Sequence, residues 1–205
     1  MSLIPLKPLE NVLEPDDWWD AFVMFDGVRF RPRELRDHHA LINSVRLGEH
    51  VPEKVRQLFE NARNAYLYAF FAHRLLPVAD LQVYASVEFA LREKAQAVDE
   101  QVPERWGMGR LFELAIERRW IVDDGFDVFR RNEAVRRQEA QDLSQIDPRI
   151  HYEPPFDTQA YCRILAESFP SLRNTLAHGS NMLHPSVIGT FEIAADLIHQ
   201  LFPSN

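Results

Sequence analysis

Two long amphipathic stretches separated by a proline constrain the fold of this chain most strongly. In the first, over about residues 52–76, apolar side chains recur at alternating steps of four and three residues, which places them on one stripe of an α-helix. The second stretch, over about residues 79–100, follows Pro77, and the pair therefore predicts two long helices packed as an antiparallel hairpin. The members of the first stripe are Val55, Phe59, Ala62, Tyr66, Ala69, His73 and Leu76.

The chain beyond this pair carries further helical patterns, over about residues 108–119, 126–143, 158–178 and from 185 onward. The second of these is strongly charged and is expected to be exposed. In the third, Pro170 predicts a break or kink, because proline lacks the backbone N–H that a helix needs. Past that point, Leu172 and Leu176 are expected to face the core, and Gly179 to cap the helix. The patterns together predict a mainly α fold, an antiparallel bundle of four to six helices.

Residues 1–50 lack this periodicity and are rich in proline and aromatic side chains. Within them, apolar residues flank Asp26-Gly27 on both sides, and Asp-Gly is a dipeptide favoured in type I′ turns. Residues 21–31 therefore predict a small β-hairpin, which must pack on the helical body because an isolated two-stranded ribbon is only marginally stable. The chain is thus divided into an N-terminal extension over 1–50 and a helical bundle over 51–205.

The composition restricts the classes of function. A formal net charge of −8 argues against loose binding of nucleic acid through bulk charge, although a small basic pocket stays compatible with it. No apolar run is long enough to cross a bilayer, and the first residues lack the apolar region of a signal peptide. Cys162 is the only cysteine and can form no intrachain disulfide. We therefore expect a cytoplasmic protein without membrane association, in which Cys162 is structural.

The segment Ser171–Gly179 brings a guanidinium, a carboxamide and an imidazole together near a predicted helix C-terminus. The fork of Arg173 matches a phosphate, and Asn174 can hydrogen-bond a ribose hydroxyl, a phosphate oxygen or an imidazole. His178 can act as an acid or a base near neutral pH. The directions of Arg173 and His178 diverge by roughly 140° on an ideal helix, so two copies of the segment from two subunits would make a denser cluster. The structural alternative is that Arg173 pairs with a nearby acid, Asn174 ties down backbone and His178 merely ends the helix.

Three further residues are candidates to support this group. Glu88 and Arg92 lie four apart on the second predicted helix, which favours an ion pair between them; alternatively, Glu88 reaches Arg173 or His178 and orients it. His184 follows in a predicted loop and is either a second polar contact to substrate or a surface residue. His73, by contrast, is expected to be a core histidine with a satisfied hydrogen bond. The sequence has neither the zinc-ligand patterns nor the glycine-rich phosphate loops of common cofactor sites, so no metal and no cofactor are expected.

The order Arg173, Asn174, three residues, His178 resembles the Arg-x4–6-His motif of the HEPN superfamily (higher eukaryotes and prokaryotes nucleotide-binding domains). The context is similar as well, because a helix pair carrying Ser86–Arg92 comes first and a short final helix follows the motif. The resemblance covers roughly residues 52–202 and leaves residues 1–50 outside it. It implies a HEPN-like helical bundle that commonly dimerises.

The resemblance also implies a chemistry, since many members of the superfamily are metal-independent endoribonucleases whose motifs meet across a dimer interface. His178 would then activate the ribose 2′-hydroxyl, Arg173 would stabilise the charge on the phosphorane, and Asn174 would position the group. This interpretation also implies a role in defence or as a toxin. The ligand would be RNA or a nucleotide, and the partner would be a cognate inhibitor protein. Other members are non-catalytic, so a nucleotide-binding or protein-interaction module stays open as the alternative function, as does a purely structural motif.

Overall fold

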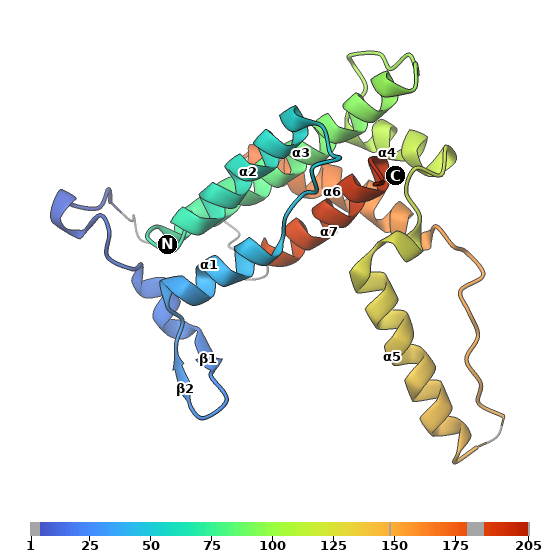
Figure 1. The fold of residues 1–205 in the computed structure, drawn as a ribbon, viewed down its shortest axis with the longest axis horizontal. Coiled ribbons are helices and arrows are strands. Elements are labelled where there is room, and N and C mark those ends of the chain that lie inside the picture. Colours follow the sequence, from blue (N-terminus) through green and yellow to red (C-terminus); the bar gives the residue numbers. More distant parts are fainter. Residues whose placement is uncertain (1–4, 148, 180–186, 205) are drawn as a thin grey trace.

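The structure is a computed structural model that describes residues 5–147, 149–179 and 187–204. Within these ranges the protein is mainly helical, with a small two-stranded antiparallel sheet near the N-terminus (Figure 1). This confirms the predicted mainly α class and the hairpin. The helices are α1 Leu35–Ser44, α2 Glu53–Tyr68, α3 Leu76–Ala97, α4 Met108–Glu117, α5 Asp127–Ser144, α6 Ala160–Ala177 and α7 Val187–Leu201, and the strands are β1 Val23–Phe25 and β2 Phe30–Pro32.

Helix α3 is the central element of the bundle. It lies against α2, α6 and α7, and α4 packs on α6 (Figure 1). The predicted pairing of the first two long helices is present as α2 and α3, and every member of the predicted stripe from Val55 to Leu76 is buried. The core is rich in aromatic side chains, which contact one another edge to face, as aromatic rings prefer to do. The largest fully buried aromatic residues are Phe59, Tyr84, Phe112, Phe126 and Phe191.

Helix α2 ends at Tyr68, well before the predicted residue 76. The N-terminal extension takes the carbonyl groups at this end: the indole of Trp19 donates to Ala69 O at 3.1 Å, and the backbone N–H of Asp16 donates to Phe70 O at 3.0 Å. The carboxylate of Asp16 also accepts from the backbone N–H and from Nδ1 of His73, at 3.1 and 2.8 Å. Tertiary contacts therefore end the helix where the periodicity alone continues, and His73 is the satisfied core histidine that was expected.

The hairpin pairs Val23 with Pro32 and Phe25 with Phe30, as an antiparallel ladder. Its turn differs from the expected type I′, which needs two central residues of positive φ. Asp26 N donates to Arg29 O at 3.1 Å, so the central residues are Gly27 and Val28, and of these only Gly27 has a positive φ, +96°. The carboxylate of Asp26 accepts the backbone N–H groups of Val28 and Arg29, both at 3.0 Å, so a side chain closes this turn.

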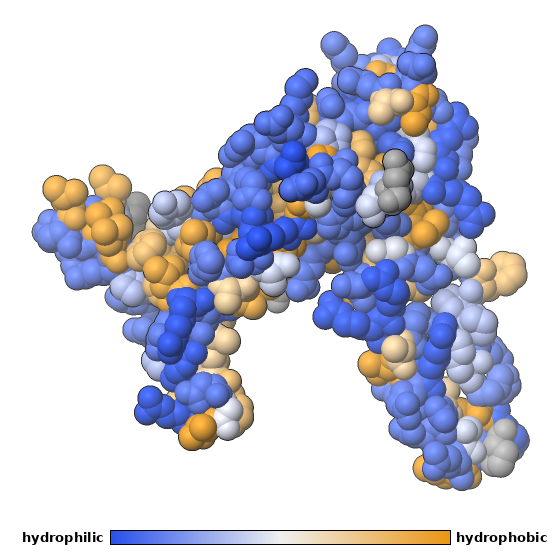
Figure 2. Space-filling model, in the orientation of Figure 1, coloured by the Kyte–Doolittle hydropathy of each residue, from blue (hydrophilic) through white to orange (hydrophobic). Residues whose placement is uncertain are grey.

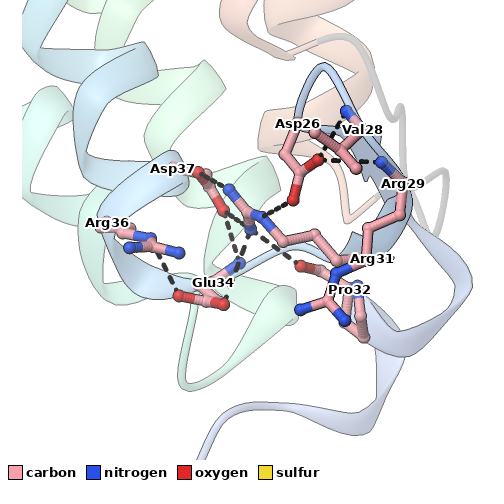
Figure 3. Close-up of polar contacts among 8 residues, drawn as sticks. All are labelled: Asp26, Val28, Arg29, Arg31, Pro32, Glu34, Arg36 and Asp37. Carbon is pink, nitrogen blue, oxygen red and sulfur yellow. Dashed lines mark hydrogen bonds and ion pairs between the residues drawn. The ribbon is translucent and has the colours of Figure 1, made fainter.

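Arg31 of β2 attaches the hairpin to the start of α1 (Figure 3). Its Nη1 and Nη2 donate to the two carboxylate oxygens of Asp37 at 2.5 and 2.7 Å. Arg31 Nη1 also lies 3.7 Å from Glu34 Oε1. Asp37 in turn accepts the backbone N–H of Glu34 at 2.9 Å, as part of a capping box at the helix N-terminus. One carboxylate thus caps α1 and holds the hairpin.

Helix α1 was not predicted, because residues 1–50 were expected to hold only the hairpin. It packs on α2 through His38 and Ile42. Trp19, Ile42 and Val45 belong to the same buried cluster as the bundle, so the extension packs on the helical body, as the marginal stability of an isolated ribbon requires. The division of the chain at residue 50 stays a prediction.

Helix α6 continues through Pro170 without the expected break. Leu172, expected to face the core, is instead exposed, whereas Leu176 is half-buried against it. Gly179 follows the helix with a φ of +87° and donates its N–H to Leu176 O at 3.1 Å, which confirms the predicted glycine cap. The predicted start of the last helix at Pro185 lies outside the described residues.

Helix α5 projects from the bundle together with the chain that returns from it (Figure 1). Glu133 is its only buried residue, so the predicted charged and exposed helix is confirmed. Figure 2 shows hydrophobic side chains gathered on the projecting N-terminal segment, whereas the α5 arm is mostly hydrophilic in this view. The most exposed large hydrophobic residues are Phe156, Leu6, Val28, Leu9 and Ile146. None of the helices in the described ranges is long and apolar enough to cross a membrane.

Candidate functional site

The motif residues occupy the last turns of α6. Arg173 and Asn174 lie within the helix, and His178 is its C-terminal cap residue, with its backbone N–H donating to Asn174 O at 3.0 Å. The imidazole of His178 is exposed. The helix end therefore presents a titratable ring to solvent one turn beyond a guanidinium and a carboxamide.

A cavity of ≈ 360 Å³ opens between α3, α4 and α6 beside the motif. Arg173 and Asn174 line it, and so do Glu88 and Arg92 of α3, which brings four of the six predicted site residues together. His178 is not among the lining residues, and His184 lies outside the described residues. The other lining residues are Glu104, Arg105, Trp106, Gly107, Met108, Gly109 and Pro170.

Glu88 is the link between the two arginines of the motif region. Its Oε1 lies 3.2 Å from Arg92 Nη2, and its Oε2 lies 3.8 Å from Arg173 Nη2. Both interpretations of Glu88 thus hold in part, because it forms the intrahelical pair and also reaches Arg173. Arg173 Nη1 donates to Asn174 Oδ1 at 3.2 Å, so the guanidinium is held from two sides while its side chain stays 42% exposed.

The wall opposite the motif comes from the segment before α4. Arg92 Nη2 donates to the carbonyl of Trp106 and so fixes this segment to α3. The side chain of Arg105, by contrast, makes no hydrogen bond or ion pair within the described part of the chain. Three arginines and two glutamates line the cavity, which leaves one net positive charge locally in a chain of net charge −8.

The close approach of α4 to α6 shapes the floor of the cavity. A Cβ atom on Gly109 would lie 3.7 Å from Pro170 Cγ and 4.0 Å from Ala166 O. Ala166 O is the carbonyl that the missing N–H of Pro170 leaves without its helical partner. Helix α6 nevertheless continues past the proline, and Arg173 and Asn174 from its last turns line the cavity.

Arg105 and Trp106 were not predicted as site residues from the sequence. The neighbouring Gly107-Met108-Gly109 run lacks the third glycine of a dinucleotide-binding loop, so its pattern predicts no binding role. The signal that could have found them is an arginine and an aromatic residue directly before the start of a helix, where backbone N–H groups are free to face an anion. Indeed, Gly107 is the N-cap of α4 and provides no side-chain hydrogen bond to the first turn.

Among the described residues, no group of three or more His, Cys, Asp or Glu is placed to hold a metal ion. No family model, no curated protein and no solved structure matches this chain.

Proposed function

We propose that this protein is a metal-independent endoribonuclease of the HEPN type, in which Arg173, Asn174 and His178 from two copies of the chain form the reaction centre. The observation that carries this proposal is the arrangement at the end of α6. A half-exposed guanidinium, oriented by Glu88 and Asn174, borders an open cavity, and an exposed imidazole follows on the same helix. These are the groups that RNA cleavage without a metal requires.

The chemistry is a transesterification. A neutral imidazole of His178 takes the proton of a ribose 2′-hydroxyl, and the 2′-oxygen attacks the adjacent phosphorus. Arg173 stabilises the added negative charge of the phosphorane, and Asn174 holds a non-bridging oxygen or the ribose. A protonated imidazole then gives its proton to the departing 5′-oxygen, so the products are a 2′,3′-cyclic phosphate and a 5′-hydroxyl. One histidine from each copy can supply the base and the acid.

The positions of Arg173 and His178 within one chain support a reaction centre built from two copies. Within a single chain, Arg173 borders the cavity whereas His178 lies beyond it at the helix end. A two-fold axis near this end would bring a second His178 to the exposed side of Arg173. The proposal further includes a homodimer in the cytoplasm, with RNA as substrate and a cognate inhibitor protein that restrains a defence or toxin activity.

A second candidate is a non-catalytic nucleotide-binding or protein-interaction module. One observation favours it specifically: Arg173 is already engaged by Glu88 and Asn174 within its own chain, as in the structural alternative. The acidic net charge of the whole chain also favours this alternative, because binding of RNA through bulk charge depends on a basic surface.

Incubation of the purified protein with mixed RNA in excess EDTA tests the proposal. We expect cleavage by the wild type, with cyclic phosphate ends, and a loss of about 10²–10⁴-fold in His178→Ala and about 10²–10³-fold in Arg173→Ala. Arg29→Ala is the matched control, because Arg29 is exposed at the hairpin turn, far from α6 (Figure 1). RNA left intact by wild type and variants alike overturns the proposal, and so does cleavage that EDTA abolishes.

A further inference from the structure

We infer that the cavity between α3, α4 and α6 is a binding subsite for one unpaired nucleotide, with Arg105 and Arg92 on its phosphate and Trp106 against its base. The inference deepens the proposed function, on which it rests for RNA as the ligand. It assigns a role to Arg105 and Trp106, which lie outside the Arg-Asn-His motif.

The first support is the charge of the cavity wall. Arg105 is a cation without an internal partner in the described ranges, and it adjoins Trp106, whose carbonyl is held by Arg92. An unpaired guanidinium next to a fixed one is a suitable arrangement for a phosphate, because arginine binds phosphate oxygens through two parallel N–H groups. Glu88 and Glu104, which also line the cavity, lower the net charge, so tight binding of a bare polyanion is not expected.

The second support is the aromatic wall. Trp106 lines the cavity and is half-buried against the core, and the guanidinium of Arg110 lies over its ring at 5.3 Å from the centroid. The indole is thus held by its packing on the core and by the guanidinium of Arg110, which lies over one face of its ring. Aromatic side chains that line basic pockets are the usual platforms for unstacked bases of single-stranded RNA.

The third support is size and position. A volume of ≈ 360 Å³ lies at the low end of the range of about 300–1,000 Å³ found for ligand pockets, which suits one nucleotide and excludes a base pair. Arg173 and Asn174 line the same cavity on its α6 side. A strand with one phosphate at Arg173 therefore has its neighbouring nucleotide at Arg105 and Trp106, and this subsite would select unpaired RNA over duplex RNA.

Binding is measured by fluorescence anisotropy with a labelled single-stranded 2′-O-methyl oligoribonucleotide. This probe lacks the free 2′-hydroxyl and cannot be cleaved by the proposed chemistry, so the readout is independent of catalysis. AMP and inorganic phosphate serve as competitors, and they separate a free nucleotide or anion from a strand as the ligand. We expect the strand to bind more tightly than AMP, and inorganic phosphate to compete weakly.

The variants are Arg105→Ala, Trp106→Leu and Trp106→Phe, with Arg29→Ala as the matched arginine control. Loss of one stacked base weakens binding by about 5- to 150-fold, from about 1–3 kcal/mol per stacked base, and Trp106→Phe should recover most of the loss in Trp106→Leu. Arg105→Ala should reduce the salt slope of log affinity by about 0.7, the value for one phosphate on a single strand. Melting curves verify that each variant is folded.

Wild-type affinity in both Arg105→Ala and Trp106→Leu overturns the inference, as does a wild type that does not bind the probe. The two proposals fail separately. Cleavage that is lost in His178→Ala and unchanged in Trp106→Leu would support the nuclease and overturn the subsite. If the probe binds less tightly to Trp106→Leu but the protein cleaves no RNA, the subsite is supported and the nuclease is overturned. Binding by inorganic phosphate as tight as by the strand reduces the cavity to an anion site and also overturns the inference.

Discussion

The carboxylate of Glu88 on α3 lies 3.8 Å from the guanidinium of Arg173 on α6, and its other oxygen lies 3.2 Å from Arg92. The Glu88–Arg173 pair joins α3 and α6 at the border of the cavity. Because one carboxylate serves two arginines, Glu88 both orients Arg173 and competes with any anion that Arg173 binds. These two effects have opposite consequences for binding and for catalysis.

Glu88→Gln separates the two effects. Removal of the negative charge should raise the affinity for the 2′-O-methyl probe by up to about fivefold, the equivalent of about 0.2–1 kcal/mol for an exposed ion pair. The same change should lower the cleavage rate of a wild-type substrate, because Arg173 loses its fixed orientation. Anisotropy and single-turnover cleavage measure the two quantities. A parallel fall of affinity and rate would contradict the role of Glu88 as a positioning residue.

The free energy of unfolding is expected to fall in mild acid because of His38. Its Nε2–H donates to Tyr66 O at 2.7 Å, and Nδ1 is buried without a hydrogen-bond partner. Burial lowers the pKa of His38 to about 4, from 6.5, and the nearby Arg33 acts in the same direction. The folded state thus resists a proton that the unfolded chain accepts, so stability is lost as the pH falls from 6.5 towards 4.

The loss from His38 is expected to reach roughly 3 kcal/mol, at about 1.4 kcal/mol per unit of pKa difference. About 2 kcal/mol of this loss falls between pH 7 and pH 5, where urea unfolding measures it. His38→Phe should be less stable at neutral pH by about 1 kcal/mol, because the carbonyl of Tyr66 loses its donor, but its stability should change less between the two pH values. An equal pH dependence in wild type and His38→Phe would exclude His38 as the source.

Arg31→Ala should release the hairpin while leaving the bundle intact. Arg31 makes two hydrogen bonds to Asp37, and its guanidinium holds the pKa of that carboxyl well below the usual range. The stabilisation by this pair is present above the unfolded pKa near 3.8 and is lost only below it, as the pH falls through the folded pKa. The contact is therefore intact at pH 5, where His38 already destabilises the fold.

Hydrogen exchange measures the release. In Arg31→Ala, the amides of β1 and β2 should exchange faster, while those of α2 and α3 keep their protection. Arg36→Ala is the matched control, because Arg36 forms an exposed pair with Glu34 at 2.9 Å and, in the described part of the chain, donates no hydrogen bond to Asp37. Unchanged protection of the strands in Arg31→Ala would show that packing alone holds the hairpin.

Cys162 should be unreactive in the folded protein. It is fully buried, and burial raises the pKa of its thiol, with Asp123 adding to the effect. Reaction with a disulfide reagent should then require global opening and be at least roughly 10³-fold slower than in urea. Fast reaction of the native protein would indicate local opening of the α6 N-terminus.

The sequence predicts those parts of the fold that repeat with a regular period. The stripe from Val55 to Leu76 is buried throughout, and α3, α4 and α5 lie close to the predicted ranges. Helix α1 escaped prediction because its buried side chains are His38 and Ile42, and a histidine is not counted as apolar. The early end of α2 depends on hydrogen bonds from Trp19 and Asp16, which come from far away in the chain.

For the candidate site, the sequence brought Glu88 and Arg173 together as one alternative, because both lie on predicted helices with long, charged side chains. It gave no reason to add Trp106, since the segment before α4 has no periodic pattern and its position depends on Arg92 binding a carbonyl. The exposure of Leu172 was also unforeseen: α6 is not broken at Pro170, and Leu172 lies on an exposed side of the continuous helix.

Dilution tests whether the reaction centre needs two chains. His178 is exposed at the end of α6, and Arg173 borders the cavity, so the proposed pairing of two imidazoles exists only in a dimer. Below the dissociation constant of the dimer, the fraction of dimer falls in proportion to total protein. A tenfold dilution in this range should therefore reduce cleavage per molecule by about tenfold, while binding of the 2′-O-methyl probe by each chain stays constant. Sedimentation at the same concentrations reports the oligomeric state, and a rate per molecule that is unchanged where the protein is monomeric would assign the activity to a single chain.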